Sequence, residues 1–508
     1  MNGPERAAHT VELLRQVAAR YPTVDAFVDA EGHRLSFGAW DRAADGVAAG
    51  LADHGVVAGD VVCLLVPSSL EYMVCYQAAM RLGAITTGVN IRLGRDEIEH
   101  IIRATTPRVT VVADDEVRVL PATAGTVVRS SQLARFWSAD APPLPTLRAR
   151  QPVLICWTGG TTGRPKGAVF DHDSLAAVAR ATGALSAAFD RRLSPIPFAH
   201  VATMTRAWDE ISRVITTVIT PARWTAAAAL RLIEQERVTV AQGVPTQWEL
   251  MLRDPVIETT NLSTVRLAGI GGSRVPPDLV QRMRAVLGVP VVNRYASTEA
   301  GGVISGTRPD DPEEVIVETV GRASDGVEVR VVEDDGTPSA VDEAGRVQVR
   351  SGAVMRGYWR DPDATGAVLD ADGWLTVGDV GRLDAAGNLT LVGRLGECYL
   401  RGAYNVYPVE VERVLAEHDR VAAVAVVGAP DPVLGEIGVA YVVPVGTVDE
   451  HELQQFAGAR LADYKVPDRV VVLDELPLTA VGKIDRRALA AWASQEPSRR
   501  VAGSAGER

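Results

Sequence analysis

The sequence predicts a multidomain protein in which an α/β part is followed by antiparallel β structure and a compact α+β part. From about Val11 to Ile102, helical periodicity alternates with short apolar runs, the pattern of a mostly parallel sheet covered by helices. After about Thr319, short strands alternate with Asp/Gly turns, which indicates hairpins. The 508 residues are enough to form several hydrophobic cores.

The first part of the chain contains candidate elements for two successive α/β halves, without an internal repeat. Leu13, Leu14 and Val17 fit one helix face, and Asp41–Ala52 fits another helix. Short apolar runs predict buried strands at Val61–Val66, Ala84–Val89, Val109–Ala113, Val153–Trp157, Val238–Ala241, Val265–Ile270 and Val289–Val292. We therefore expect a large N-terminal domain that contains two α/β subdomains.

The segments after about Thr319 predict antiparallel strands in place of the α/β pattern. Val327–Val332 and Arg346–Arg350 flank an Asp/Gly turn, and Arg382–Leu391 turns around Asp384–Asn388, so we expect a small β-barrel. The run from Gly393 to Gly396 then interrupts the pattern. Beyond it, the predicted helices are Pro408–Glu417 and Glu452–Leu461, and the predicted strands are Val421–Val427 and Val439–Val443. We place an N-terminal domain at residues 1–395, a small α+β domain at 396–495 and a disordered tail at 496–508.

Composition and charge argue against several classes of protein. The chain is 47% hydrophobic and 23% charged, as globular proteins are, and its net charge of -12 disfavours nucleic acid or an anionic membrane as a partner. The N-terminus has no apolar segment of a secretory signal, and Val61–Val66 is too short to span a bilayer. The scattered cysteines have no metal-like or redox-like spacing, so we expect reduced thiols in a cytoplasmic protein. They are Cys63, Cys75, Cys156 and Cys398.

Lysine is rare in this chain. Of 52 basic residues only Lys166, Lys465 and Lys483 are lysine, and all three lie beside glycine, proline or tyrosine. A chain so rich in arginine is expected to keep lysine where a planar guanidinium cannot replace a compact, mobile ammonium. The alternative is that these three lysines are present by chance.

The segment Trp157–Gly167 has the composition of a phosphate-binding loop. It follows the predicted strand Val153–Trp157 and precedes a helix that Asp171 or Asp173 could cap. Its glycines let backbone N–H groups point into one concavity, its threonines add hydroxyl donors, and Lys166 adds a positive charge. The Walker A pattern is absent, and a surface turn is the alternative.

Polar residues also follow other predicted strands, at the edge where ligands bind in α/β sheets. Three such residues follow the predicted strand Val289–Val292. The ring of Tyr295 offers a face on which a nucleobase could stack, Thr298 offers a hydroxyl, and Glu299 offers a hard oxygen ligand for Mg²⁺. Asp379, at the end of the strand-like segment Trp374–Val377, would suit ribose hydroxyls. A solvated glutamate and an aspartate in a turn are the alternatives for these two carboxylates.

Three further residues need a role. Lys483 lies on a Gly-flanked turn before a helix, and the scarcity of lysine favours a function for it. Lys465, within Tyr-Lys-Val-Pro, is expected to be structural. His200 either lines a pocket or is a hydrogen-bonded histidine of the core.

Taken together and in this order, these segments resemble the adenylate-forming superfamily of acyl-CoA synthetases, carrier-loading adenylation domains and beetle luciferases. The resemblance extends from about Pro22 to Leu489. It rests on residues 157–167, 197–200, Tyr295–Glu299, Val377–Asp379, Gly393–Arg394, Asn405–Pro408 and Gly482–Lys483.

The resemblance implies an enzyme that joins a carboxylic acid to AMP at the expense of ATP and then passes the acyl group to CoA. Lys483, on a mobile C-terminal domain, would bridge the substrate carboxylate and the α-phosphate. Thr298 would contact the α-phosphate, and Glu299 would bind Mg²⁺. The phosphate loop would be Thr158, Gly159, Gly160, Thr161, Thr162, Gly163 and Lys166, the adenine site Gly272, Ser273, Asn293 and Tyr295, and the ribose site Asp379 and Arg394.

The resemblance also implies a site for the acyl group. The resemblance places it among His200, Trp208, Thr246, Gly271, Ala296 and Gly301. Small residues near the reacting end favour a bulky polycyclic or aryl acid over a linear fatty acid. A homodimer is compatible with these assignments.

The chain departs from the family pattern at the face that serves the CoA step. Gly396 stands where the hinge residue is usually Asp or Lys, and Ala403 replaces the second glycine of a pair whose first member is Gly402. The alternative function is therefore an adenylating enzyme whose acyl-AMP is thioesterified by a partner enzyme. A luciferase-like oxygenase shares these motifs, an amino-acid-activating domain lacks the expected Asp around Phe198–Thr203, and a non-catalytic nucleotide-binding protein would not need Lys483 and Glu299.

Overall fold

The computed structural model describes residues 7–114, 120–136, 144–158, 165–273, 275–395, 399–401, 404–479 and 483–495. The chain forms two compact units. The first contains residues 1–330, 348–377 and 383–390, and the second contains residues 331–347, 378–382 and 391–508. The expected boundary residue Gly396 lies outside the described residues, so the division into residues 1–395 and 396–495 stays a prediction.

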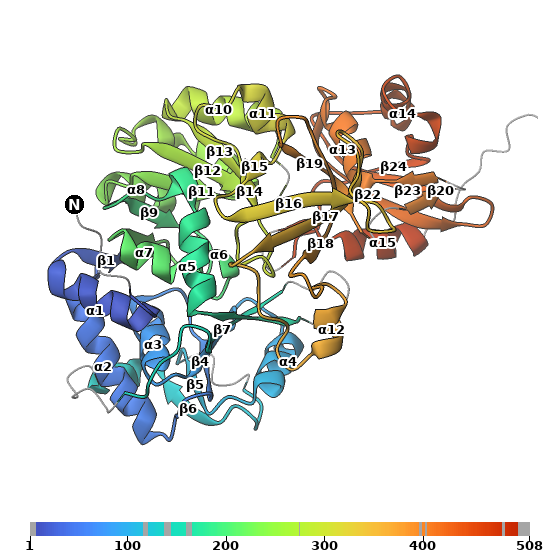
Figure 1. The fold of residues 1–508 in the computed structure, drawn as a ribbon. Coiled ribbons are helices and arrows are strands. Elements are labelled where there is room, and N and C mark those ends of the chain that lie inside the picture. The colour runs from blue at the N-terminus through green and yellow to red at the C-terminus, as the bar shows by residue number, and fades with distance from the viewer. Residues whose placement is uncertain are drawn as a thin grey trace, which may run out of the picture. The chain divides into compact units, whose positions relative to one another are not determined.

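The first unit contains a six-stranded sheet that confirms the early strand predictions (Figure 1). Its order is β6 (Thr126–Arg129), β5 (Val109–Val112), β3 (Val61–Leu65), β4 (Ile85–Gly88), β7 (Pro152–Trp157) and β8 (Gly167–Asp171). All neighbours are parallel except β7 and β8, which form a hairpin. The connecting helices are α2 (Phe37–Asp53), α3 (Leu70–Arg81) and α4 (Arg95–Thr105). Ile98, Ile101 and Ile102 of α4 pack on Cys63 and Val112 of the sheet.

A nine-stranded sheet is the second layer of this unit. Its order is β15 (Arg322–Ala323), β14 (Ser305–Gly306), β13 (Val291–Tyr295), β12 (Leu267–Gly271), β11 (Val240–Gly243), β9 (Arg191–Ser194), β10 (Thr216–Ile219), β1 (Asp25–Val28) and β2 (Arg34–Ser36). Strands β13 to β1 are parallel neighbours, and β1 pairs with β10 in the register Phe27 to Thr217. The N-terminal hairpin β1–β2 therefore joins the sheet formed by much later residues.

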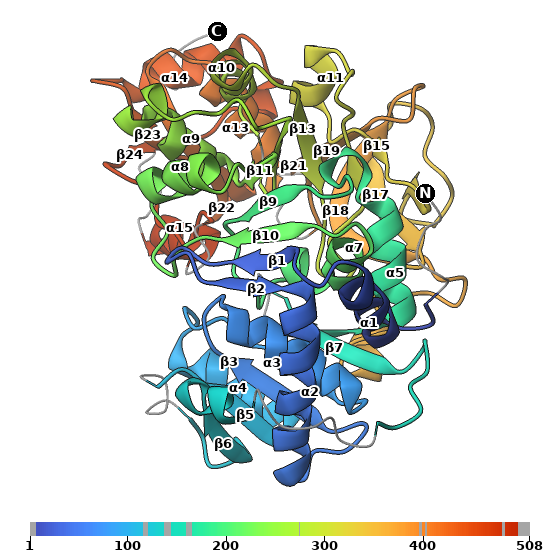
Figure 2. The same ribbon diagram turned by 90° about the vertical axis from the view of Figure 1, so that its left-hand side faces the viewer.

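Helices cover both faces of the nine-stranded sheet. Figure 2 shows α8 and α9 on one side and α5 and α7 on the other. Trp248 and Met251 of α9 share a buried cluster with Leu230 of α8 and Met283 of α10. The helices of this region are α1 (Thr10–Arg20), α5 (His172–Ala181), α6 (Val201–Met204), α7 (Ala207–Ser212), α8 (Ala226–Gln235), α9 (Pro245–Arg253), α10 (Pro277–Leu287) and α11 (Glu313–Glu318).

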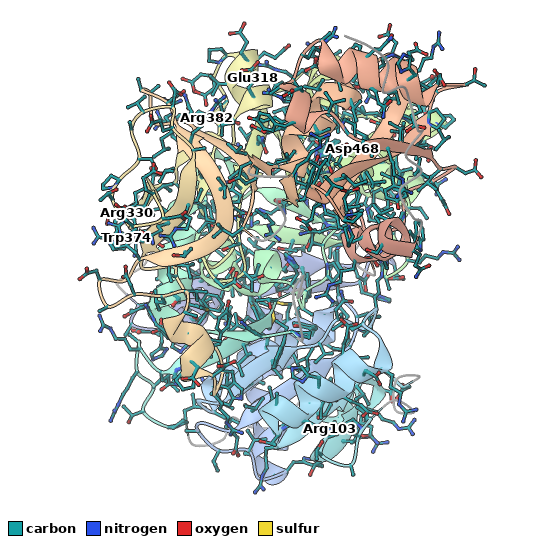
Figure 3. All side chains as sticks on the ribbon, turned by 90° about the vertical axis from the view of Figure 1, so that its right-hand side faces the viewer. Arg103, Glu318, Arg330, Trp374, Arg382 and Asp468 are labelled. Atoms are coloured by element: carbon teal, nitrogen blue, oxygen red, sulfur yellow. The ribbon has the colours of Figure 1, made fainter. Side chains whose placement is uncertain are left out.

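The predicted hairpins after Thr319 form a four-stranded sheet. Its strands, β16 (Val327–Val332), β17 (Gly345–Ser351), β18 (Leu375–Leu383) and β19 (Leu389–Arg394), are neighbours in chain order, and the short helix α12 (Pro362–Gly366) precedes β18. Arg330 and Arg350 stack on the ring of Trp374 at 4.0 and 4.5 Å from its centroid, and Figure 3 shows Arg330 beside Trp374. The expectation that Asp379 ends a strand is wrong, because β18 continues to Leu383 between two neighbouring strands.

The second unit contains a five-stranded sheet between helices. Its order is β21 (Tyr404–Val406), β20 (Tyr399–Arg401), β23 (Gly435–Pro444) and β22 (Val421–Asp431), with β24 (Arg469–Val472) also paired to β23. Side chains alternate between the two faces of a strand. Val426 accordingly packs in the cluster of α13 (Pro408–Ala416) and α14 (Glu450–Gly458), whereas Val427 packs in the cluster of α15 (Arg486–Gln495). The predicted α+β character of this part is confirmed.

Two expectations from composition can be compared with the fold. Cys63, Cys75 and Cys156 are free and buried, as expected of structural thiols, and Cys398 lies outside the described residues. None of the helices in the described part of the chain is both long and apolar enough to cross a membrane.

Candidate active site

Except for Trp208 on α7, the predicted adenine-site and acyl-pocket residues lie near or after the ends of strands of the nine-stranded sheet. Strands β9, β11, β12 and β13 are parallel, so the residues that follow them meet at their carboxyl ends, where α/β sheets bind ligands. The amide of Gln247, after β11, donates to the carbonyl of Pro195, after β9, at 3.4 Å. A β-carbon on Gly272, after β12, would lie 3.4 Å from the Val244 side chain.

The residues of the predicted adenine site differ in exposure. Tyr295 is 8% exposed, whereas Gly272 and Ser273 lie exposed after β12. The amide nitrogen of Asn293 donates to the carbonyl of Thr319 at 3.0 Å, so this buried side chain helps to hold the strand in place. The assignment of Asn293 to the adenine edge stays a prediction.

His200 is not a core histidine, because the residue is exposed. It follows β9 and begins helix α6, where its Nδ1 accepts a hydrogen bond from the Ala202 N–H at 3.2 Å. The hydroxyl of Thr205, just after α6, donates to the carbonyl of Gly301 at 2.9 Å. The segment that carries His200 is therefore held against Gly301, while the acyl-pocket role of His200 stays a prediction.

Backbone geometry explains why glycine is present at two of the predicted acyl-pocket positions. A β-carbon on Gly271 would lie 2.3 Å from the Arg294 carbonyl oxygen. Gly301 has φ +73°, and a β-carbon there would lie 2.5 Å from the Ala353 carbonyl oxygen. Close approach requires glycine at both sites whatever the substrate, and at Gly301 the positive φ adds to this requirement. Gly271 and Gly301 therefore do not support the inference that the substrate is a bulky acid.

The other predicted acyl-pocket residues lie on several elements. Thr246 is exposed in the first turn of α9, and Ala296 is exposed directly after β13. Trp208 is half-buried on α7, the helix that packs against α1 and α5. The contribution of Trp208 to the acyl pocket stays a prediction.

Two hydrogen bonds join the two ends of the phosphate loop where it leaves the six-stranded sheet. The Thr158 N–H donates to the Lys166 carbonyl at 2.9 Å, and the Lys166 N–H donates to the Thr158 hydroxyl at 3.1 Å. Gly159, Gly160, Thr161, Thr162 and Gly163 lie outside the described residues. The predicted cap of the following helix is confirmed, since the carboxylate of Asp171 accepts from the Ser174 N–H at 2.8 Å.

Glu299 meets a residue that the sequence interpretation missed. The hydroxyl of Tyr358 donates to Glu299 Oε1 at 2.8 Å, and Lys166 Nζ lies 5.1 Å from the centroid of the Tyr358 ring. Burial and the neighbouring Glu299 carboxylate raise the pKa of the phenol, which keeps it protonated and donating. The only local hint was the aromatic pair Tyr358–Trp359 after Gly357, which has no diagnostic spacing.

Thr298 lies beside Glu299 in the turn after β13. Its carbonyl accepts from the Gly301 N–H at 3.1 Å, and the Glu299 carbonyl accepts from the Met355 N–H at 2.8 Å. Both residues are half-buried. The turn that would face the ATP phosphates is therefore held by one backbone hydrogen bond within itself and by one to the segment that contains Met355.

The second unit brings together three residues predicted from separate motifs. The Arg394 guanidinium donates through Nε to Asp379 Oδ1 at 2.7 Å. Although Lys483 is an exposed residue, neighbouring protein atoms desolvate its ammonium and lower its pKa below the usual lysine value. Arg394 lowers this pKa further, and Asp379 acts in the opposite direction, so the three charges are close enough to interact.

A short hairpin presents Lys483. The Thr479 N–H donates to the Lys483 carbonyl at 2.6 Å, the Lys483 N–H donates to the Thr479 hydroxyl at 3.2 Å, and Leu478 bridges to Ile484. By contrast, Lys465 Nζ lies 2.7 Å from Glu410 Oε2. The expectation that Lys465 is structural is consistent with this ion pair. Gly396, Gly402 and Ala403 lie outside the described residues.

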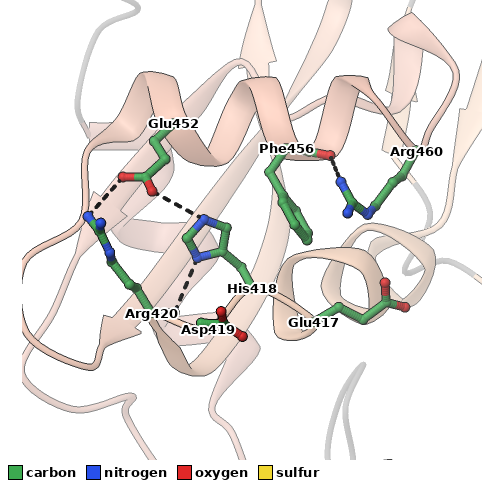
Figure 4. A pocket seen from close by; sticks show the side chains of 7 residues that line it. All are labelled: Glu417, His418, Asp419, Arg420, Glu452, Phe456 and Arg460. Atoms are coloured by element: carbon green, nitrogen blue, oxygen red, sulfur yellow. Dashed lines mark hydrogen bonds and ion pairs between the residues drawn. The ribbon is translucent and has the colours of Figure 1, made fainter.

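One cavity of about 420 Å³ in the second unit contains none of the predicted residues (Figure 4). Some of its charged groups pair with one another. Glu452 lies 3.1 Å from Arg420 and 3.4 Å from His418, and the Arg460 guanidinium lies 3.6 Å from the centroid of the Phe456 ring. This hollow is therefore a surface held together by its own ion pairs.

Comparisons with family models and with known proteins indicate the same family. The AMP-binding enzyme family matches residues 14–359, and the AMP-binding enzyme C-terminal domain matches residues 410–483. The chain is 34% identical over 488 residues to the indoleacetate–CoA ligase of Aromatoleum aromaticum, covering 92% of this chain and 93% of that protein. It is 34% identical over 459 residues to a feruloyl-CoA synthase from an Amycolatopsis species, covering 89% and 93%.

A solved structure agrees with these relatives. The Mycobacterium tuberculosis fatty acyl CoA synthetase superimposes with a TM-score of 0.79 and 29% identity, over 96% of this chain and 99% of that chain. The expected fold class and the expected family are both confirmed by these matches. The chain belongs to the AMP-binding enzyme family, as an acyl-CoA synthetase of the adenylate-forming superfamily that activates a carboxylic acid with ATP and transfers the acyl group to CoA.

Proposed function

We propose that Lys483 and Glu299 are the main catalytic groups of the adenylation step. In this step a carboxylate oxygen of the acid attacks the α-phosphorus of ATP, the new P–O bond forms as the bond to pyrophosphate breaks, and acyl-AMP results. Two anions must approach each other, so positive charge near the reacting atoms lowers the barrier. The observations that support the proposal are the hydrogen bond between Arg394 and Asp379 and the influence of both charges on the pKa of Lys483.

The nucleotide is proposed to use the other predicted residues in the roles that the motifs suggest. Asp379 and Arg394 would hold the ribose, Tyr295 would stack on adenine, and Thr158 and Lys166 would hold the β- and γ-phosphates. Glu299 offers a half-buried carboxylate, which suits a hard cation. Bound Mg²⁺ would neutralise phosphate charge.

We also propose an aromatic carboxylic acid as the substrate class. Support comes from two relatives whose names specify indoleacetate and feruloyl-CoA, whereas the structural neighbour is named for fatty acyl groups. ATP–pyrophosphate exchange should therefore be faster with indole-3-acetate or ferulate than with a linear acid such as octanoate. The same acids incubated with CoA should give thioester. Exchange with octanoate alone would contradict the proposed substrate class.

Replacing Glu299 with Gln should raise the Mg²⁺ concentration at half-maximal exchange by about ten-fold or more, since an amide is a poorer ligand for this cation than a carboxylate. The measurement is a Mg²⁺ titration of exchange at constant ATP. Glu318→Gln, at the end of α11, serves as a matched control and should titrate like the unaltered enzyme. An unchanged titration of Glu299→Gln would show that another group holds the metal.

The CoA step gives a separate prediction from the sequence. If the methyl group of Ala403 narrows the path of the pantetheine arm, Ala403→Gly should speed thioester formation from isolated acyl-adenylate several-fold and leave pyrophosphate exchange unchanged. Single-turnover reactions with CoA measure the first rate. A slow CoA step in the unaltered enzyme would favour a partner enzyme that thioesterifies the acyl-AMP. Equal rates for both forms would remove any role for the methyl group.

A further inference from the structure

Tyr358 lies between two charged groups that are proposed to hold the same ATP molecule. Its hydroxyl donates to Glu299 Oε1 at 2.8 Å. The face of its ring receives the ammonium of Lys166, with Nζ 5.1 Å from the centroid, which is within the range of a cation–π interaction. One side chain therefore contacts both the carboxylate after β13 and the lysine at the end of the phosphate loop.

The position of Tyr358 is fixed by its own backbone. Its N–H donates to the Thr365 hydroxyl at 2.8 Å, and Ala168 of β8 forms a bridge with it. The flanking residues are also held, because the Trp359 N–H donates to the Gly167 carbonyl at 2.7 Å. These contacts anchor the tyrosine to the strand that follows the phosphate loop.

An ion pair to a buried carboxylate adds a further anchor to the same segment. The Arg356 guanidinium donates to both carboxylate oxygens of Asp171, at 2.6 and 2.9 Å, and the Asp171 side chain is 2% exposed. Asp171 is also the cap of α5. The segment is thus rigidly attached to the six-stranded sheet, while the Tyr358 hydroxyl reaches a carboxylate of the nine-stranded sheet.

We propose that Tyr358 is a positioning residue for MgATP, which orients the Glu299 carboxylate toward the metal and holds it at a constant distance from Lys166. This inference rests on the proposed metal-binding role of Glu299. A hydrogen bond to a metal-binding carboxylate restricts its rotation, and loss of such a partner typically costs 10- to 100-fold in metal affinity. The two contacts of Tyr358 predict separable effects, since only the hydroxyl touches Glu299 and only the ring touches Lys166.

Two substitutions separate these contacts. Tyr358→Phe keeps the ring and removes the hydroxyl, so the Mg²⁺ concentration at half-maximal ATP binding should rise about ten-fold, while ATP affinity at saturating Mg²⁺ stays nearly constant. Tyr358→Leu removes both contacts and should also weaken ATP binding at saturating Mg²⁺. Tyr441→Phe removes the hydroxyl of a buried tyrosine that donates to the Leu489 carbonyl at 3.2 Å, and it should change neither quantity. Calorimetric titration with ATP at a series of Mg²⁺ concentrations measures both.

A double-mutant comparison tests whether Tyr358 acts through Glu299. In the background of Glu299→Ala, Tyr358→Phe should no longer change the Mg²⁺ dependence, because the hydrogen-bond acceptor is gone. An equal change in both backgrounds would overturn the positioning role and indicate a general structural effect. If Glu299→Ala alone leaves the Mg²⁺ dependence unchanged, the proposed metal-binding role fails and the inference fails with it. If Glu299→Ala raises the Mg²⁺ requirement but Tyr358→Phe does not, only the inference is overturned.

Discussion

Lys483→Ala is expected to lower the rate of ATP–pyrophosphate exchange by about 100- to 1000-fold, the usual effect of removing one group that stabilises transition-state charge. ATP binding should be nearly unchanged, because the proposed phosphate and metal contacts, Lys166 and Glu299, belong to the other compact unit. An interaction made mainly in the transition state lowers kcat more than it weakens binding. Exchange kinetics and calorimetry of ATP binding measure the two effects on one sample.

The chain offers a matched control for this substitution. Lys465→Ala removes the ammonium that pairs with Glu410 in the same unit, and it should leave exchange within about two-fold of the unaltered rate if this ion pair is only structural. Equal losses for both lysine variants would indicate a general effect on the second unit. Unaltered exchange in Lys483→Ala would remove Lys483 from the mechanism.

Asp209→Ala is expected to cause the largest loss of stability, about 3–5 kcal/mol, because it leaves buried guanidinium groups without their counter-ion. Asp209 is fully buried on α7, and its carboxylate accepts from Arg192 at 2.9 Å, Arg213 at 2.6 Å and Ser186 at 2.7 Å. The Arg192 side chain is only 2% exposed. Unfolding in urea, followed by the fluorescence of buried tryptophans such as Trp248, measures the change.

The pKa of Asp209 adds a second observable. Burial alone would raise this pKa, but the neighbouring arginines, Arg192 and Arg206 first, lower it below the usual aspartate value. A lowered pKa in the folded state contributes stability at neutral pH that is lost as the pH falls. The difference in stability between Asp209→Ala and the unaltered protein should therefore shrink on acidification.

An exposed carboxylate of the same unit is the control for the stability measurement. Asp278 is 68% exposed and pairs with Arg282 four residues later on α10. Asp278→Ala should change the free energy of unfolding by less than about 1 kcal/mol, as is usual for exposed ion pairs. A similarly small change for Asp209→Ala would show that the buried arginines find other partners or water.

The sequence by itself determined the elements of the fold and much of the chemistry. Largely apolar runs of five or six residues predicted β3, β4, β5 and β7 because a strand buried on both faces needs no polar alternation. The helix cap could be narrowed to Asp171 or Asp173 because capping depends on residues three positions apart, and the structure selects Asp171. Lys166 and Lys483 stood out because arginine supplies nearly all other basic residues. These properties are local, and local spacing is visible in one sequence.

The tertiary structure alone decided which distant segments meet. Strand β1 pairs with β10, whose residues lie about 190 positions later, and its apolar run contains nothing that specifies this partner. The glycines at 271 and 301 were interpreted as space for substrate, but the carbonyls of Arg294 and Ala353 occupy the space where a side chain would lie. The contact of Tyr358 with Glu299 was not predicted at all. Hydrophobic periodicity records only which face of an element is buried, whereas the partner on that face depends on the packing of the whole chain.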